Sequence, residues 1–130
     1  MTGLRPKQSI EIILTTLGRP PTLNRVVRMN SIGQRSKITR EWREAATQLW
    51  SYHDAEIIPP VKVIATPLHN NMCSPQDAGA CLPAVKAALD GAVDAGLLAD
   101  DDYRYVRSVI LEAPEFSTVD GLRVRLESQT

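Results

Sequence analysis

The sequence predicts a single α+β domain in which two main helices pack on a mixed β-sheet of about four strands. Two observations predict this fold class. Four short β-rich segments recur along the chain, and two longer segments repeat their apolar residues at helical spacing. The expected order is strand, loop, helix, strand, loop, helix, strand, strand. With 130 residues, of which 43% are hydrophobic and 23% charged, residues 1–130 can bury one core without disulfides.

The first half of the chain is expected to hold one strand, a long loop and one helix. Residues 9–16 (SIEIILTT) are rich in β-formers and end before residues 18–21 (GRPP), whose two prolines cannot donate to a strand ladder. Residues 18–37 show little periodicity and are predicted to form a long basic loop. A helix is then expected from Thr39, which can cap it, to about Tyr52.

The second half is expected to contain three strands around one helix. Strands are predicted at 61–67, 105–112 and 122–127, and the last two are expected to pair as a hairpin. Residues 68–81 are predicted to be a loop. If the strands at 61–67 and 105–112 are parallel, the segment between them is a right-handed crossover.

The helix of this crossover is predicted at residues 82–95. Pro83 suits its first turn, and Gly96 suits the position just after its end. Polar side chains recur every four residues and so lie on one side of the helix. They are Lys86, Asp90 and Asp94.

Composition places the chain in a reducing compartment. No apolar run is long enough to span a bilayer and no signal-peptide pattern is present, so no membrane association is expected. Two cysteines are too few for a disulfide framework, and a cytoplasmic location is expected. His69, Cys73 and Cys81 could surround Asp77 as zinc ligands, but their spacing fits no common zinc finger. A free histidine and two unpaired thiols are the favoured interpretation.

Charge is distributed unevenly, although the net charge is zero. Residues 1–44 contain nine basic and three acidic side chains, whereas residues 45–130 contain six basic and twelve acidic ones. Such asymmetry is a hint of polyanion binding. It suits a nuclease, in which cations hold phosphates and carboxylates hold a metal. The alternative is a dipolar surface without a role.

Acidic residues flank the second predicted helix. Asp77 precedes it, residues 100–102 (DDD) follow it, and Lys86 lies in its first half. Carboxylates from separate segments can converge on one Mg²⁺, and a nearby lysine can steady a phosphate. A helix of about 14 residues is roughly 21 Å long, so Asp77 and the triplet meet only if the preceding loop folds back or two chains share the site. A solvated acidic turn without function is the alternative.

The stretch from Lys86 to Asp101 (KAALDGAVDAGLLADD) resembles the signature of the RusA-type Holliday junction resolvases. That signature is a lysine, an aspartate four residues on, a turn at Ala-Gly and a paired aspartate. Residues 19–25 (RPPTLNR) are similar to the family's Pro-Pro-x-x-Asn-x-Arg segment. The two matches stand in the family's order and, with the expected elements between them, the resemblance covers about residues 9–127. The resemblance implies a RusA-like mixed sheet, a homodimer, and Mg²⁺-dependent cleavage of Holliday junctions or other branched DNA.

The resemblance also implies roles for individual residues. Asp77 and Asp101 would be metal ligands for Mg²⁺, with Mn²⁺ as a substitute. Asp100 and Lys86 would complete the catalytic set, and residues 68–81 would form the active-site loop. Small nucleases of this kind are typical of phages and prophages, so the resemblance implies such an origin.

The family's Asp-x-Asp-Asn element is incomplete in this chain. If Asp77 stands for its first aspartate, Gly79 and Ala80 stand where the second aspartate and the asparagine belong. A site with fewer carboxylates holds Mg²⁺ more weakly. A catalytically impaired RusA-fold protein that binds DNA or a protein partner without cleavage is therefore the alternative. A small regulatory protein that binds a host protein and no DNA is a third hypothesis.

Polar and basic residues of the first third are the candidate DNA contacts, because arginine and asparagine side chains in loops bind phosphates without reading bases. No P-loop or Rossmann glycine pattern is present, so no nucleotide cofactor is expected. The candidate DNA-binding residues are Arg19, Asn24, Arg25, Arg28, Asn30, Arg35 and Lys37.

Overall fold

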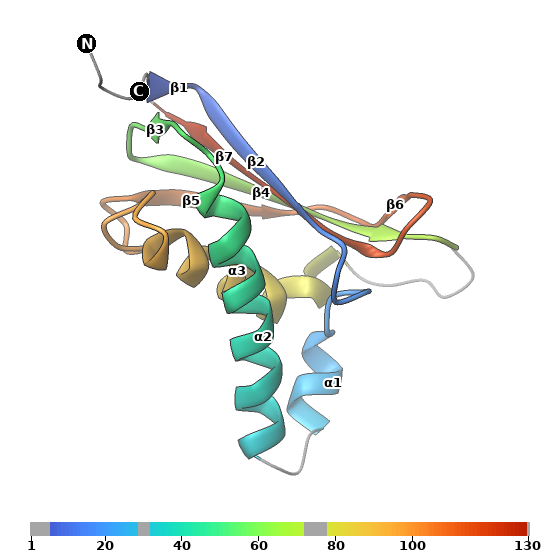
Figure 1. The fold of residues 1–130 in the computed structure, drawn as a ribbon. Coiled ribbons are helices and arrows are strands. Elements are labelled where there is room, and N and C mark those ends of the chain that lie inside the picture. Colours follow the sequence, from blue (N-terminus) through green and yellow to red (C-terminus); the bar gives the residue numbers. More distant parts are fainter. Residues whose placement is uncertain (1–5, 29–31, 72–77, 130) are drawn as a thin grey trace.

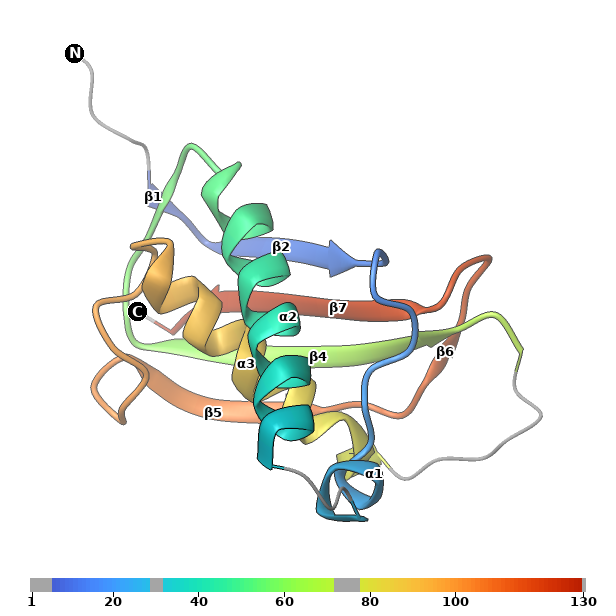
Figure 2. The same ribbon diagram turned by 60° about the horizontal axis from the view of Figure 1, so that its bottom comes forward.

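A computed structural model describes residues 6–28, 32–71 and 78–129. Its centre is a five-stranded sheet in which β2, β7, β4 and β5 lie side by side in that order and β6 pairs with the far end of β4 (Figures 1 and 2). The strands are β2 (Ser9–Leu14), β4 (Val61–His69), β5 (Val106–Leu111), β6 (Glu115–Phe116) and β7 (Gly121–Ser128). β7 runs antiparallel to both neighbours, while β5 and β6 run parallel to β4. The predicted mixed sheet is confirmed.

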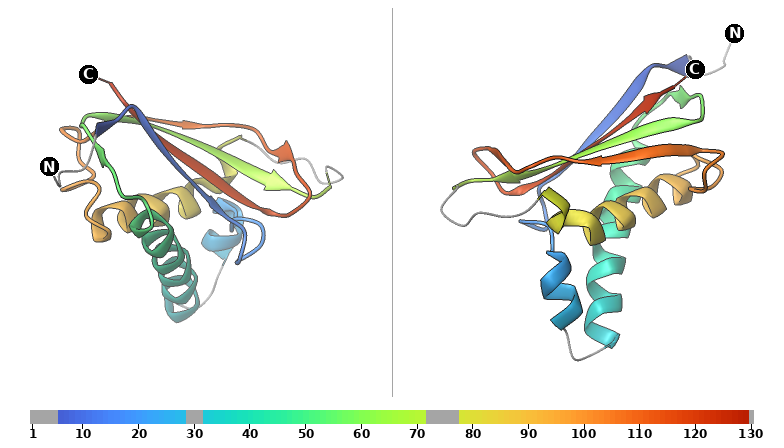
Figure 3. Two further views of the ribbon diagram at one scale, coloured as in Figure 1. Left: turned by 45° about the horizontal axis from the view of Figure 1, so that its top comes forward. Right: turned by 180° about the vertical axis from the view of Figure 1, so that it is seen from behind.

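Helices cover one face of this sheet, as both views of Figure 3 show. They are α1 (Leu23–Arg28), α2 (Ile32–Ser51) and α3 (Leu82–Asp94), and the short 3₁₀ helix η1 (Ala78–Cys81) leads into α3. A separate parallel pair joins β1 (Pro6–Lys7) to β3 (Glu56–Ile57). α2 crosses α3, and its first half projects away from the sheet together with α1 (Figure 1). None of the helices in the described ranges is both long and apolar enough to cross a membrane.

The core lies between the sheet and the crossing of α2 and α3. Leu122, Val124 and Leu126 of β7 are fully buried, as their alternation predicts. Trp50 of α2 is also fully buried, and its indole N–H donates to the carbonyl oxygen of Ala88 at 3.0 Å. This bond joins the two main helices and satisfies the polar end of the buried aromatic ring.

The expectation of a terminal hairpin is wrong. β7 does not pair with β5, because it lies between β2 and β4 and bonds to both. In the central position both backbone edges of β7 are paired, and its inner face is closed by the helices. β4 pairs with β5 in parallel, which fulfils the condition for a crossover through α3.

The expectation of a loop over residues 18–37 is also wrong, because α1 and the start of α2 lie within it. The Thr22 hydroxyl accepts a hydrogen bond from the Arg25 N–H at 3.1 Å and so caps α1. α2 begins at Ile32, seven residues before the predicted cap at Thr39. Ile38 packs against the core one turn before the buried Trp42, and this contact extends the helix upstream.

Candidate functional site

The helix that carries the downstream motif has the ends that its sequence predicts. Pro83 lies in the first turn of α3, and Gly96 adopts a positive φ of 83° just after it. The N–H of Leu97 donates to the carbonyl of Ala92 at 3.0 Å, which satisfies a free carbonyl at the helix end. Leu98 is then buried against the core and turns the chain back.

This return brings the two ends of the motif together. Asp101 lies after the helix, yet its Oδ2 is 3.5 Å from Nζ of Lys86, which lies in the first half of α3. The lysine side chain is 61% exposed and the aspartate side chain 29% exposed, so both remain accessible to a ligand. The acidic turn therefore folds back along α3. As a result, Asp101 lies nearer to the start of the helix than the length of the helix alone suggests.

The neighbouring aspartates are engaged within the turn itself. Asp100 Oδ1 accepts the N–H of Asp101 at 2.8 Å. Asp102 accepts the N–H of Arg104 and two bonds from its guanidinium, at 3.0 and 2.7 Å. Hydrogen bonds from Arg104 hold the pKa of Asp102 below its usual range. Asp100 and Asp102 shape the turn, whereas Asp101 faces Lys86.

The predicted metal site is only partly within the described residues. Asp77, predicted as its first ligand, lies outside them, so its distance to Asp101 stays a prediction. Gly79 and Ala80 belong to η1 and bring no carboxylate. Over residues 6–28, 32–71 and 78–129, no three histidine, cysteine, aspartate or glutamate side chains gather as metal ligands. His69 and Cys81 are buried, and Cys73 lies outside the described residues, as Asp77 does.

Most candidate DNA contacts lie on the projecting helices. Asn24, Arg25 and Arg28 are exposed on α1, and Lys37 is exposed on α2. Asn30 lies outside the described residues. These side chains occupy helices rather than the loop that the sequence predicts.

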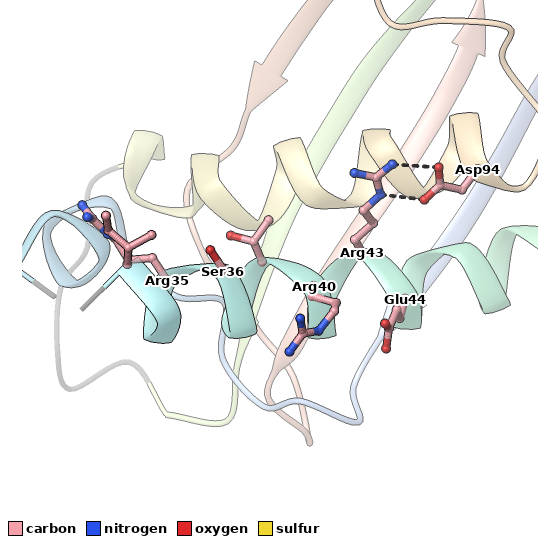
Figure 4. A pocket seen from close by; sticks show the side chains of 8 residues that line it. Arg35, Ser36, Arg40, Arg43, Glu44 and Asp94 are labelled. Atoms are coloured by element: carbon pink, nitrogen blue, oxygen red, sulfur yellow. Dashed lines mark hydrogen bonds and ion pairs between the residues drawn. The ribbon is translucent and has the colours of Figure 1, made fainter. Parts of the chain in front are cut away.

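An open groove of about 780 Å³ runs along the first half of α2 to the end of α3 (Figure 4). Arg35, already a candidate, lines it together with Arg40 and Arg43, which sequence reasoning missed. The missed signal is the spacing of Arg35 and Arg43, eight residues apart and so on one helix face. Arg43 donates two bonds to the carboxylate of Asp94, at 2.6 and 2.8 Å, and this pairing lowers the pKa of Asp94.

Arg19 has a different environment from the other candidates. Its guanidinium donates to the carboxylate of Asp120, to the side-chain oxygen of Asn70 and to the carbonyl of Asn71. Its side chain is 27% exposed. A phosphate would have to compete with these three acceptors, so a DNA contact by Arg19 stays a prediction that the local bonding does not favour.

The two motif segments meet at the junction of α1, α2 and α3. A narrow cleft is lined by Pro21 of the upstream segment, by Val26 of α1, and by Pro83, Ala84 and Ala87 of α3. The upstream segment and the helix that carries Lys86 are therefore neighbours in space. Comparison with known proteins adds no family here, since no family model and no characterised protein matches this chain.

Proposed function

We propose that this chain is a RusA-like, metal-dependent endonuclease that cuts Holliday junctions or other branched DNA. The observation that carries the proposal is the convergence on α3 of segments that are distant in sequence. Lys86 and Asp101 are 3.5 Å apart, and the Pro-Pro segment packs against the start of the same helix. The order of these motifs along the chain is the order in the family that the sequence resembles.

The residues that remain fit a divalent metal in part. Asp101 offers a partly exposed carboxylate, and hard oxygen ligands of this kind suit Mg²⁺ or Mn²⁺. Asp77 would supply the second ligand and Asp100 would support the turn. A bound ion would lower the pKa of a water molecule and so provide the nucleophile for phosphodiester hydrolysis.

Lys86 has the position of a phosphate-binding group. Its ammonium is anchored by Asp101 and is otherwise largely exposed, so it can hold a scissile phosphate beside the acidic turn. The exposed cations of α1 and α2 would hold the flanking backbone by charge, which suits recognition of DNA shape. In this proposal the chain acts in the cytoplasm as a homodimer, in which each copy cuts one strand.

The proposal is tested by incubating the purified protein with a labelled four-way junction and with linear duplexes of the same arms, in Mg²⁺ and in chelator. Cutting that requires the metal and prefers the junction is the expected result. An intact junction in Mg²⁺ and in Mn²⁺, at protein concentrations that shift the DNA on a gel, contradicts the catalytic proposal.

The second candidate is a RusA-fold protein that binds DNA or a protein partner without cutting. It is favoured by one observation: residues 78–85, which lead into Lys86, contain no carboxylate. Calorimetric titration with Mn²⁺ separates the candidates. Stoichiometric binding that Asp101→Asn abolishes argues for the nuclease, whereas DNA binding without any metal binding argues for this second candidate.

A further inference from the structure

The Arg19 guanidinium joins three segments that are far apart in sequence. Its Nε donates to Asp120 Oδ1 at 2.9 Å, and its Nη2 donates to Asn70 Oδ1 at 3.3 Å and to the carbonyl oxygen of Asn71 at 3.2 Å. Asp120 Oδ1 also accepts the backbone N–H of Asn70 at 2.9 Å. Arg19, Asn70 and Asp120 are called the Arg19 clamp below.

The clamp is held by charge as well as by geometry. The Asn70 amide and then the Arg19 guanidinium hold the pKa of Asp120 below its usual range, so the carboxylate is ionised at neutral pH. Hydrogen bonds between charged partners are shorter and stronger than neutral ones. Both side chains of the Arg19–Asp120 pair are 27% exposed, so solvent screens this ion pair less than it screens a fully exposed pair.

The clamp lies where the chain leaves β4. Asn70 is the first residue after that strand, and Asp120 immediately precedes β7 beside it. On the other side of β4, the carbonyl of His69 accepts the N–H of Ser117 at 2.9 Å, next to the pairing with β6. The end of β4 is therefore fixed from both sides, immediately before the segment that leads to Asp77.

The same guanidinium belongs to the upstream Pro-Pro segment and fixes it as well. Arg19 opens the segment that continues through the buried Pro20 and Pro21 to α1, and Pro21 lines the cleft against the start of α3. One side chain thus ties the upstream motif to the end of β4. Together these roles engage Nε and Nη2 of the guanidinium in bonds within the protein.

We propose that Arg19 is a positioning residue rather than a DNA contact. Through Asp120 and Asn70 it fixes the end of β4 against the start of β7, and it ties the upstream Pro-Pro segment to this end of the sheet. This inference rests on the proposed nuclease function, and it reassigns a residue that sequence reasoning places among the phosphate contacts.

The experiment compares the steady-state cleavage of a four-way junction by the wild-type protein and by Arg19→Gln, Asp120→Ala and the double variant. Because a misplacement of about 1 Å can cost up to about 100-fold in rate, each single variant should lower kcat by about 10- to 100-fold with little change in KM. The double variant should lose no more than the worse single variant, because the residues act as one unit. All rates are measured well below the unfolding temperature of each variant.

Arg25→Gln is the matched control, since it makes the same change six residues on, at an exposed candidate contact. It should raise KM and reduce the slope of log binding constant against log salt by about 0.9, as expected for one lost phosphate contact. Arg19→Lys separates charge from geometry further. A lysine keeps the charge that a phosphate needs but not the planar fork, so its kcat should stay below the wild-type value.

The inference is overturned if Arg19→Gln behaves like Arg25→Gln, or if Asp120→Ala tightens DNA binding and leaves kcat unchanged. A wild-type protein that cuts no junction contradicts the proposed function instead. Hydrogen exchange of the Asn70 amide then tests the clamp alone. Faster exchange in Arg19→Gln and Asp120→Ala supports it, and unchanged exchange overturns it.

Discussion

Three consecutive aspartates of one turn perform three different tasks. Asp100 bonds to a backbone N–H, Asp102 binds Arg104, and Asp101 alone faces Lys86. The sequence identifies the triplet but does not say which carboxylate is available, because this depends on how the turn closes. The role of Arg19 was equally out of reach, since its partners lie 51 and 101 residues away.

His69 is the buried residue from which we expect the clearest pH dependence of folding stability. It is 1% exposed, and over the described residues its Nε2 is the buried side-chain atom left without a hydrogen-bond partner. Burial, and then the neighbouring Arg19, lower its pKa, with Asp120 acting in the opposite direction. The folded protein therefore binds the proton less readily than the unfolded chain, whose histidine has a pKa of about 6.5.

The sign of the effect follows from linkage. Below about pH 6.5 the unfolded state binds more protons at this site than the folded state, so folding stability should fall as the pH falls from 7 to 5. Urea unfolding at a series of pH values measures the slope, and His69→Leu should make it shallower. NMR titration provides the direct check: a His69 ring that titrates at or above the usual histidine pKa contradicts this account.

At the scale of elements, α3 was predictable because its signals are local. Pro83, Gly96 and the apolar stripe lie within the helix or next to it, and the observed bounds of Leu82–Asp94 match the prediction closely. α1 and the first half of α2 were missed because their apolar spacing is poor. Ile38 and Trp42 of α2 pack against the core, and this tertiary contact is not revealed by a local pattern.

The crossing of α2 and α3 depends on the absence of a side chain at Gly91. A Cβ there would lie 2.9 Å from the Thr47 nitrogen and 3.0 Å from Ala46 Cβ. Gly91→Ala should therefore destabilise the protein by about 1–3 kcal/mol through overpacking, despite the better helix propensity of alanine. Gly79→Ala is the control, since its Cβ would meet no atom within 4 Å. Equal unfolding free energies for the two variants would contradict the close helix crossing.

The projecting helix α1 should contribute to DNA binding through its exposed basic side chains. Arg28→Gln removes one exposed cation at its end and should weaken binding to junctions and duplexes alike. The magnitude of the salt slope should fall by about 0.9 for each phosphate contact that is lost. Gel-shift titrations over a range of salt concentrations measure this. Arg107→Gln, at an exposed position on β5, is the control and should leave the slope unchanged. Unchanged binding by Arg28→Gln would exclude α1 from the DNA surface.

At the scale of the whole molecule, the α+β class followed from the order of elements, whereas the direction of β5 relative to β4 was left open. The strand order did not follow from it, because sequence neighbours usually pair and β5 and β7 do not. β7 bonds to both β2 and β4, so its central place rests on backbone pairing with two strands that are far from it in sequence. The candidate site depends on this arrangement, because α3 packs on the sheet and holds Lys86 beside the acidic turn that follows the helix.

Single-turnover cleavage of a four-way junction in Mn²⁺, by the wild-type protein and by Asp101→Asn, is the most direct test of the central claim. If Asp101 is a metal ligand as proposed, its loss should lower the rate by at least about 10- to 100-fold, which is the cost of losing a supporting group. Asp54→Asn makes the same change at an exposed carboxylate before β3 and should cut at the wild-type rate. Metal-dependent cutting by the wild type and by Asp54→Asn, with little by Asp101→Asn, is the result this account predicts. Equal cutting by all three proteins, or no cutting by any of them, would contradict it.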